Sequence, residues 1–136
     1  MFDSIVIAAA LYLNKPTPAC TNPLVIELRE AGFRGNDLKE AWAIAMRESH
    51  GREKAISQTG DYGLFQINKA AHGKNRWWND KKMLDGEYNA EIAHYMSNGG
   101  KNWSAWDITG DGKYIGNYSP RSVYSKFKEW LKKYPC

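Results

Sequence analysis

The sequence has few cysteines and prolines and no long hydrophobic run. Two Cys and five Pro occur in 136 residues. The apolar stretch of residues 5–13 is too short to cross a bilayer as a helix, so no membrane insertion of the mature chain is predicted. The three histidines, His50, His72 and His94, lack the His-x-x-x-His spacing of zinc sites. Zinc-finger, basic-zipper and RNA-recognition signatures are absent too, so we predict no metal, no organic cofactor and no nucleic-acid partner.

Composition and charge are those of one globular domain with a basic surface. Hydrophobic residues make up 43% of the chain and charged residues 25%, which is ordinary for a domain with a real core. Aromatic residues reach 13%, which favours a surface that stacks on sugars or bases, although a tryptophan-rich core explains each Trp equally well. The net charge is +4, with lysines densest in the final segment. This balance suits an anionic polymer such as nucleic acid, a membrane surface or a bacterial wall, or else a solvated helix face.

Residues 1–19 are predicted to be a leader and residues 20–136 the domain. The apolar run at 5–13 is followed by small residues that resemble a cleavage site. Asp3 stands where a leader normally has a basic residue, and the alternative is an N-terminal helix packed on the domain. Export would also suit the cysteines, because Cys20 and Cys136 at the two ends of the domain suggest a disulfide that joins the termini. Two free thiols in a cytosolic protein are the alternative.

Helix signals alternate with one hairpin signal, which predicts an α+β fold that is mainly α. A helix begins at Asn22 and Pro23, a cap followed by proline. A second begins at Asp37, with Glu40 completing a capping box. Residues 56–68, with glycines among β-formers, predict a small hairpin. Further helices are predicted from Asp85 to Ser97, with Ile92, Ala93, Tyr95 and Met96 as the apolar stripe, at residues 103–106 as a short helix or turn, and from residues 119–120 onward.

Two carboxylates are placed near one apolar, turn-forming segment. Glu48 ends the second helix at its apolar edge, where lost hydration should raise its pKa. Asp61 starts the hairpin strand in the octapeptide of residues 61–68. Two carboxyl groups on separate elements around a cleft are what cleavage of a glycosidic bond requires. Without the neighbouring octapeptide, the preferred interpretation of Glu48 is an ordinary surface glutamate.

One competing motif concerns calcium. Asp107, Thr109, Asp111 and Gly112 match the first half of an EF-hand loop. The twelfth position is Tyr118, where the loop needs a bidentate Glu, so a glycine-rich turn is the preferred interpretation.

From Cys20 to Cys136 the chain resembles chicken-type lysozymes. The octapeptide of residues 61–68 is similar to the segment with that family's second catalytic carboxylate, and Glu48 matches its acid. Residues 76–80 resemble its tryptophan pair, and residues 103–106 resemble its Trp-x-Ala-Trp. The two cysteines match its terminal disulfide. The resemblance implies a helical lobe and a small β-hairpin lobe with a cleft between them.

Some features are closer to soluble lytic transglycosylases, goose-type lysozymes and phage tail lysozyme domains. The interval from Glu48 to Asp61 is shorter than in chicken-type enzymes, the loop from Asn68 to Arg76 is longer, and the family's other disulfides are missing. Residues 47–51 and 63–66 are similar to the acid and Gly-Leu-x-Gln motifs of the transglycosylase group. That group often works with one carboxylate, and some members release a 1,6-anhydro sugar.

The resemblance implies a monomeric muramidase, secreted or delivered by a phage, that cleaves the β-1,4 bond after N-acetylmuramic acid in peptidoglycan. Glu48 would be the acid and Asp61 the second carboxylate, with Trp103 as the apolar wall beside Glu48. The residues expected to contact sugar are Tyr62, Gln66, Asn68, Trp77, Trp78 and Trp103. A lytic transglycosylase, a wall- or sugar-binding protein without activity and a basic nucleic-acid binder are the alternatives.

Overall fold

The computed structural model describes residues 20–108 and 120–136. Within these ranges the elements are, in order, α2 (Pro23–Glu30), α3 (Gly35–Ser49), β1 (Asp61–Tyr62), β2 (Ile67–Asn68), α4 (Lys69–His72), the 3-10 helix η1 (Lys82–Leu84), α5 (Gly86–Met96), the 3-10 helix η2 (Ser104–Trp106) and α6 (Pro120–Lys132). The predicted leader and most of the calcium-like loop lie outside the described residues. No helix in the described ranges combines the length and apolarity needed to span a membrane.

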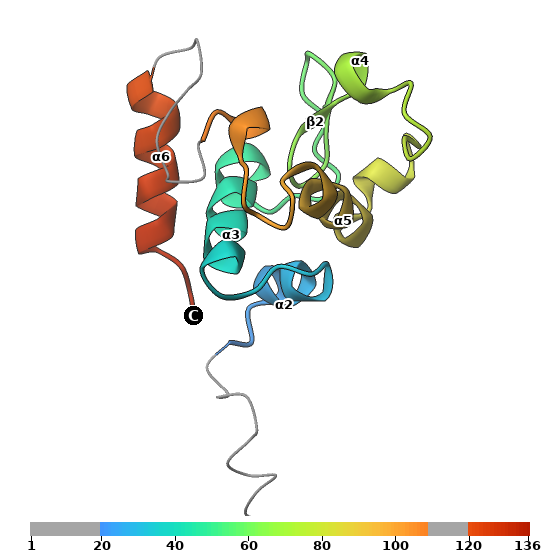
Figure 1. The fold of residues 1–136 in the computed structure, drawn as a ribbon. Coiled ribbons are helices and arrows are strands. Elements are labelled where there is room, and N and C mark those ends of the chain that lie inside the picture. The colour runs from blue at the N-terminus through green and yellow to red at the C-terminus, as the bar shows by residue number, and fades with distance from the viewer. Residues whose placement is uncertain (1–19, 109–119) are drawn as a thin grey trace, which may run out of the picture.

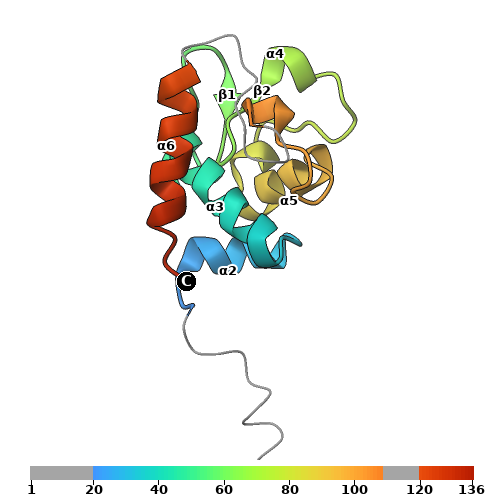
Figure 2. The ribbon, with the colours of Figure 1, turned by 60° about the vertical axis from the view of Figure 1, so that its left-hand side comes forward.

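Helix α3 is the centre of the fold. It lies between α6 and α5, with α2 across one end and the hairpin and α4 toward the other (Figures 1 and 2). Its buried positions, Leu38, Ala41, Ala45 and their neighbours, fill the core against these elements. The predicted α+β class, mainly helical with one small antiparallel sheet, is confirmed.

Local capping explains where two helices begin. Asn22 accepts a hydrogen bond from the Val25 amide (3.2 Å) at the start of α2, directly before a proline at the first helical position. Asp85 accepts from the Tyr88 amide (3.0 Å) and caps α5. Both starts are those predicted, because a cap needs only residues three positions apart.

Two details of the helices correct the prediction. The second helix begins at Gly35, not at Asp37, because the Leu38 amide already donates to the Arg34 carbonyl. Asp37 lies in the first turn and pairs with Lys101 (2.6 Å), so the capping box with Glu40 is wrong. In α5, Tyr95 is 71% exposed and does not belong to the apolar stripe.

The end of α3 turns the chain toward the hairpin. His50 takes a left-handed conformation (φ 56°) and Gly51 follows with φ 78°, which ends the helix at Ser49. In the hairpin, Asp61 pairs with Asn68 and Tyr62 with Ile67, while Ile56 adds an isolated bridge to Tyr62. The predicted hairpin is therefore present with very short strands.

Aromatic side chains form the part of the core between the helices and the hairpin. Phe33, Phe65 and Trp103 are fully buried, and Trp106 is 5% exposed. Trp103 stacks on Phe65 (ring centroids 6.0 Å apart) and on Phe33 (5.6 Å), and meets Trp106 edge to face (5.2 Å). Aromatic pairs at these separations add to the area that they bury, and this cluster ties η2 to the hairpin.

Cys20 and Cys136 form a disulfide, as predicted, with their Cα atoms 5.2 Å apart. The bond joins the segment before α2 to the segment after α6, across 116 positions of sequence.

Reduction of this disulfide should lower the melting temperature without abolishing the fold at room temperature. Closing so long a loop contributes up to about 4–5 kcal/mol in the chain-entropy model, and measured values are often smaller. The measurement is thermal unfolding with and without reductant. A Cys20→Ser/Cys136→Ser variant is the control and should not respond to reductant. Two alkylatable thiols in the native protein would contradict the bond.

Candidate active site

One cleft of about 670 Å³ collects residues from both lobes. The end of α3, the hairpin, α4, α5 and η2 all contribute to it. Its lining residues are Glu48, Thr59, Asp61, Gln66, Ile67, Asn68, Ala71, His72, Met96, Ala105, Trp106 and Asp107. The structure therefore brings together four of the residues that the sequence singled out, namely Glu48, Asp61, Gln66 and Asn68.

Glu48 occupies an environment that favours the protonated acid. Its side chain is 26% exposed, in the last turn of α3. Burial raises the pKa of Glu48, the guanidinium of Arg47 (Nε to carboxylate 3.9 Å) opposes this in part, and the negative charges of Asp61 and Asp107 add to the rise. The net pKa lies above the ordinary glutamate value, so this group retains its proton to higher pH than an exposed glutamate does.

Asp61 occupies the opposite environment. One of its oxygens accepts hydrogen bonds from the hydroxyls of Ser57 (2.7 Å) and Thr59 (2.8 Å), and the other accepts from the Asn68 amide (3.0 Å). Partial burial raises the pKa of Asp61, but these three hydrogen bonds outweigh it and hold the pKa below the usual range. The cleft thus contains one carboxyl that favours the acid form and one that favours the carboxylate.

The amides of Gln66 and Asn68 shape the hairpin. Gln66 Nε2 donates to the carbonyls of Ala55 (3.1 Å) and Gly63 (3.0 Å), and Gln66 itself has φ 51°. Asn68 donates to Thr59 and Asp61, and its side-chain oxygen accepts from the Ala71 amide at the start of α4. Both residues line the cleft, and these contacts fix the loop that holds Asp61.

The sequence interpretation missed Asn89, which attaches the hairpin to the helical lobe. This fully buried side chain accepts from the Phe65 amide (2.9 Å) and donates to the carbonyls of Tyr62 (2.9 Å) and Met83 (2.9 Å). The chain approaches Asn89 closely at Gly63 (φ 76°), where a Cβ would clash with the Met83 carbonyl and the Asn89 amide. The available signal was a polar residue three positions before Ile92, on the face of α5 that is buried.

Of the two tryptophans in residues 103–106, one lies in the core and the other lines the cleft. Trp103 lies in the core, stacked between Phe33 and Phe65, and it is not among the cleft residues, so its predicted contact with sugar is wrong for this structure. Trp106 lines the cleft instead, and its Nε1 donates to the Phe65 carbonyl (2.7 Å). Arg47 also donates to the Trp106 carbonyl (2.7 Å), which ties η2 to the helix that bears Glu48.

Tyr62, Trp77 and Trp78 form an aromatic cluster outside the lining of the cleft. Tyr62 meets Trp78 edge to face (5.2 Å), and Trp77 lies 6.2 Å from Trp78. His72, which lines the cleft, lies 5.8 Å from Trp77 and connects the two regions. Both tryptophans are half-buried against the core, so part of each side chain remains at the surface.

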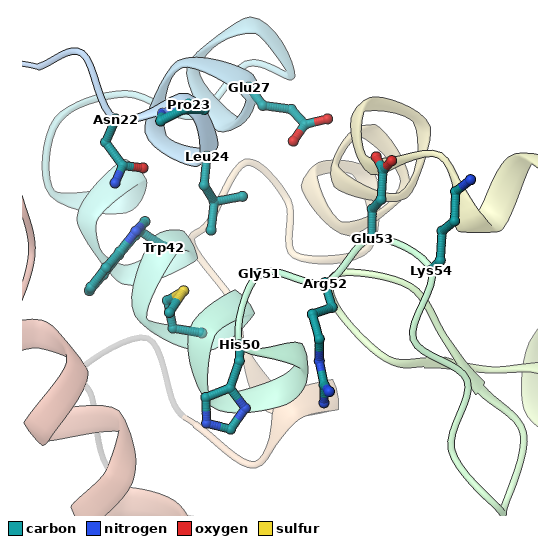
Figure 3. Close-up of a pocket in the computed structure, with 11 residues that line it drawn as sticks. Asn22, Pro23, Leu24, Glu27, Trp42, His50, Gly51, Arg52, Glu53 and Lys54 are labelled. Carbon is teal, nitrogen blue, oxygen red and sulfur yellow. The ribbon is translucent and has the colours of Figure 1, made fainter.

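A second cavity of about 670 Å³ lies beside the same end of α3 (Figure 3). Leu24, Trp42 and Met46 give it apolar walls. Figure 3 shows Glu27 and Glu53 together on the side away from α6. Burial, and then the charge of Glu53, raise the pKa of Glu27, while Glu53 accepts a hydrogen bond from the Gly86 amide (3.0 Å). None of the predicted catalytic or sugar-binding residues lines this cavity.

The profile of the lysozyme-like domain family matches residues 27–108, which is more than half of the chain and includes every residue of the cleft. The chain therefore belongs to the lysozyme-like domain family. This family comprises glycosidases and transglycosylases that act on peptidoglycan. Comparison with curated proteins and with solved structures gave no match. In the described residues, no group of three or more His, Cys, Asp or Glu is arranged to hold a metal ion.

Replacing Asn89 by alanine should destabilise the fold strongly. The change removes the partner of the buried Phe65 amide, of the buried Met83 carbonyl and of the partly buried Tyr62 carbonyl, which costs at least about 3 kcal/mol. Denaturant unfolding measures the loss. Asn79→Ala is the matched control, because that exposed amide accepts one hydrogen bond from the Lys82 amide (2.9 Å), and it should cost about 1 kcal/mol or less. Equal losses in the two variants would contradict the role given to Asn89.

Proposed function

We propose that this protein is a muramidase that hydrolyses the β-1,4 bond between N-acetylmuramic acid and N-acetylglucosamine in peptidoglycan. The observation that carries the proposal is the pair of carboxyl groups in one cleft. Glu48 is desolvated at a helix end, and Asp61 is held by three hydrogen-bond donors. Membership of the lysozyme-like domain family supports peptidoglycan as the substrate. The two carboxyl groups in the cleft support acid-catalysed cleavage of a glycosidic bond.

In the first step, Glu48 acts as the general acid. Its proton passes to the glycosidic oxygen as the bond from that oxygen to C1 breaks, so the leaving sugar departs neutral and C1 becomes cationic. Lysozyme is the best-known enzyme in which one neutral and one ionised carboxyl share the catalysis in this way. The same assignment is made here because Glu48 is desolvated, as the acid of lysozyme is, and Asp61 lies in a polar, hydrogen-bonded environment, as the second carboxyl of lysozyme does.

In the second step, Asp61 stabilises the cationic sugar and Glu48 activates water. Three hydrogen bonds already share the negative charge of Asp61, which fits electrostatic stabilisation better than direct attack on C1. Water attacks C1, and its proton passes to the Glu48 carboxylate, which restores the acid. One water is consumed for each bond that is cleaved.

The walls of the cleft would hold the sugars. Trp106, Met96 and His72 give apolar and aromatic faces, with Gln66 and Asn68 beside them. We also propose that the aromatic cluster of Tyr62, Trp77 and Trp78 extends this surface through His72. We further propose that the protein is a monomer and that it acts on the wall from outside the cell or after delivery by a phage. The disulfide is compatible with an extracellular location.

One observation favours a lytic transglycosylase as the second candidate. Both oxygens of Asp61 are engaged within the hairpin, as expected of a residue that only shapes a turn. In that reaction the C6 hydroxyl of the muramic sugar attacks C1 in place of water. Glu48 then supplies the proton to the leaving sugar and takes one from the hydroxyl, and the product carries a 1,6-anhydro ring.

Glu48→Gln should abolish cleavage of purified peptidoglycan, because the amide keeps the shape of the side chain and removes the proton. The expected loss is about 10²–10⁴-fold. Wall clearing gives the rate, and mass spectrometry of the released muropeptides gives the chemistry. Glu91→Gln, on the exposed side of α5, is the matched control and should retain the full rate.

Free reducing ends are the products expected of a muramidase. Predominantly anhydro products would assign the protein to the transglycosylases. Binding of the wild-type protein to the wall with no released product would make it a wall-binding protein. A Glu48→Gln variant within tenfold of the wild-type rate would remove Glu48 from the mechanism.

The rate should depend on pH through both carboxyls. Activity requires Glu48 protonated, so kcat/KM falls as pH rises through its pKa, which lies above 4.5. It also requires Asp61 ionised, so kcat/KM falls as pH drops through its pKa, which lies below 3.8.

The Asp61→Asn variant should lose at least about tenfold in kcat/KM, or roughly 1.4 kcal/mol of transition-state stabilisation.

Thr59→Val provides the matched test of the acidic limb. It removes one donor to Asp61 but keeps the carboxylate, so the acidic limb should move to higher pH while the alkaline limb stays in place. An acidic limb that is unchanged in this variant and in Asp61→Asn would separate Asp61 from catalysis.

A further inference from the structure

The net charge of the protein is concentrated in its last segment. Residues 120–136 contain five Lys and Arg and one Glu, a net charge of +4, which equals the net charge of the whole chain. The preceding 119 residues are therefore balanced, with equal numbers of acidic and basic side chains. A charge confined to one helix creates a local field that a uniform distribution would not.

Helix α6 directs this charge to the solvent. Phe127 is buried (2% exposed), and Trp130 and Leu131 are half-buried on the side that packs on α3. Exposed on the outer side are four lysines, namely Lys126, Lys128 and Lys132 on the helix and Lys133 directly after it, which we call the lysine face. In both views α6 forms one edge of the molecule, with this outer side uncovered in the part of the chain that the structure describes (Figures 1 and 2).

Two of these lysines are positioned by aromatic rings. Lys128 Nζ lies 4.8 Å from the Tyr124 ring centroid, and Lys133 Nζ lies 5.1 Å from that of Trp130. Among residues 20–108 and 120–136, no carboxylate lies within 4 Å of the ammonium group of any lysine on this face. The described ion pairs therefore leave these four charges available for an outside partner.

The region around the second cavity carries charges of both signs. Glu27 and Glu53 lie together on the side of the second cavity away from α6 (Figure 3). Asp85, Glu87 and Glu30 add negative charge around Glu27. Arg52 and Lys54 line the same cavity, so this region has no excess of positive charge, whereas residues 120–136 carry a net charge of +4 that attracts a polyanion to α6.

We infer that the lysine face of α6 binds the carboxylates of peptidoglycan and holds the enzyme on its polymer between cleavage events. The identity of the polymer rests on the proposed function. A membrane fits less well, because the exposed positions of residues 124–133 carry Ser125 and Glu129 besides the lysines and no large apolar side chain. The apolar side of α6 is already buried in the core, so it is not available for insertion.

The binding test uses the Glu48→Gln protein, which does not degrade its partner during the assay. The probe is peptidoglycan from which phosphate polymers have been removed with acid, and co-sedimentation at low salt gives the affinity. Lys126→Gln/Lys132→Gln removes two charges and spares the lysines that lie over aromatic rings. Lys54→Gln/Lys81→Gln removes two exposed charges elsewhere and is the matched control.

The first pair should weaken binding about tenfold and the control less than about twofold, since the charge on α6 dominates the field. The difference should disappear at about 0.5 M salt, where screening acts within a few ångströms. Equal affinities, or equal losses in the two pairs, would overturn the proposal. Binding to phosphate-bearing walls or to anionic lipid vesicles, without binding to the stripped polymer, would overturn it too.

The same two double variants, made with Glu48 intact, are then compared for their rate of peptidoglycan cleavage. Lys126→Gln/Lys132→Gln should lower kcat/KM on intact peptidoglycan and leave the rate on a short soluble glycan unchanged, because only the polymer reaches from the cleft to α6. If the wild-type protein releases no product, the proposed function fails while the co-sedimentation result still decides the role of the lysine face.

Discussion

The buried amide of Asn89 is the constraint on which the site depends. From α5 it bonds the Phe65 amide and the carbonyls of Tyr62 and Met83, so one side chain joins three separate segments. The hairpin strands pair over two residues each, which is too little to fix a lobe in place by themselves. Because the hairpin carries Asp61 and α3 carries Glu48, the relation between the two carboxyls depends on this attachment.

The two carboxyl groups differ because the elements that bear them differ. Burial at the end of α3 removes part of the hydration of Glu48, and Arg47 binds the Trp106 carbonyl instead of forming a close pair with Glu48. The turn before β1 places two hydroxyls and one amide around Asp61. Local backbone geometry thus separates an acid from a carboxylate within one cleft, without a metal ion in the mechanism proposed here.

The sequence predicted best what depends on near neighbours. The caps of Asn22 and Asp85 need residues three positions apart, and the prolines and glycines mark the ends of helices. The terminal disulfide was predicted from two cysteines at the ends of the domain, and the pair of Glu48 and Asp61 from carboxyls on neighbouring elements, and the family resemblance supported both. Trp103 and Trp106 show the limit, because only tertiary packing decides which of two similar side chains stacks between Phe33 and Phe65. Asn89 was missed for the same reason, since its partners lie 6 to 27 positions away.

Gly63 has a consequence for how the cleft adapts to a ligand. The hairpin already touches the Met83 carbonyl and Asn89 at this glycine, so it cannot move closer to the helices there. Moving away would break the hydrogen bonds of Asn89. At Gly63 the hairpin therefore cannot shift toward the helices without a clash or away from them without losing hydrogen bonds, so the two lobes do not hinge at this point. Gly60, in the turn that presents Thr59 and Asp61, has nothing within 4 Å of its Cβ position. That open space does not loosen the turn, because Asn68 donates to the Thr59 carbonyl and to Asp61 and the Lys69 amide donates to the Gly60 carbonyl (2.9 Å). Accommodation of a substrate is thus left to rotations of the side chains that line the cleft.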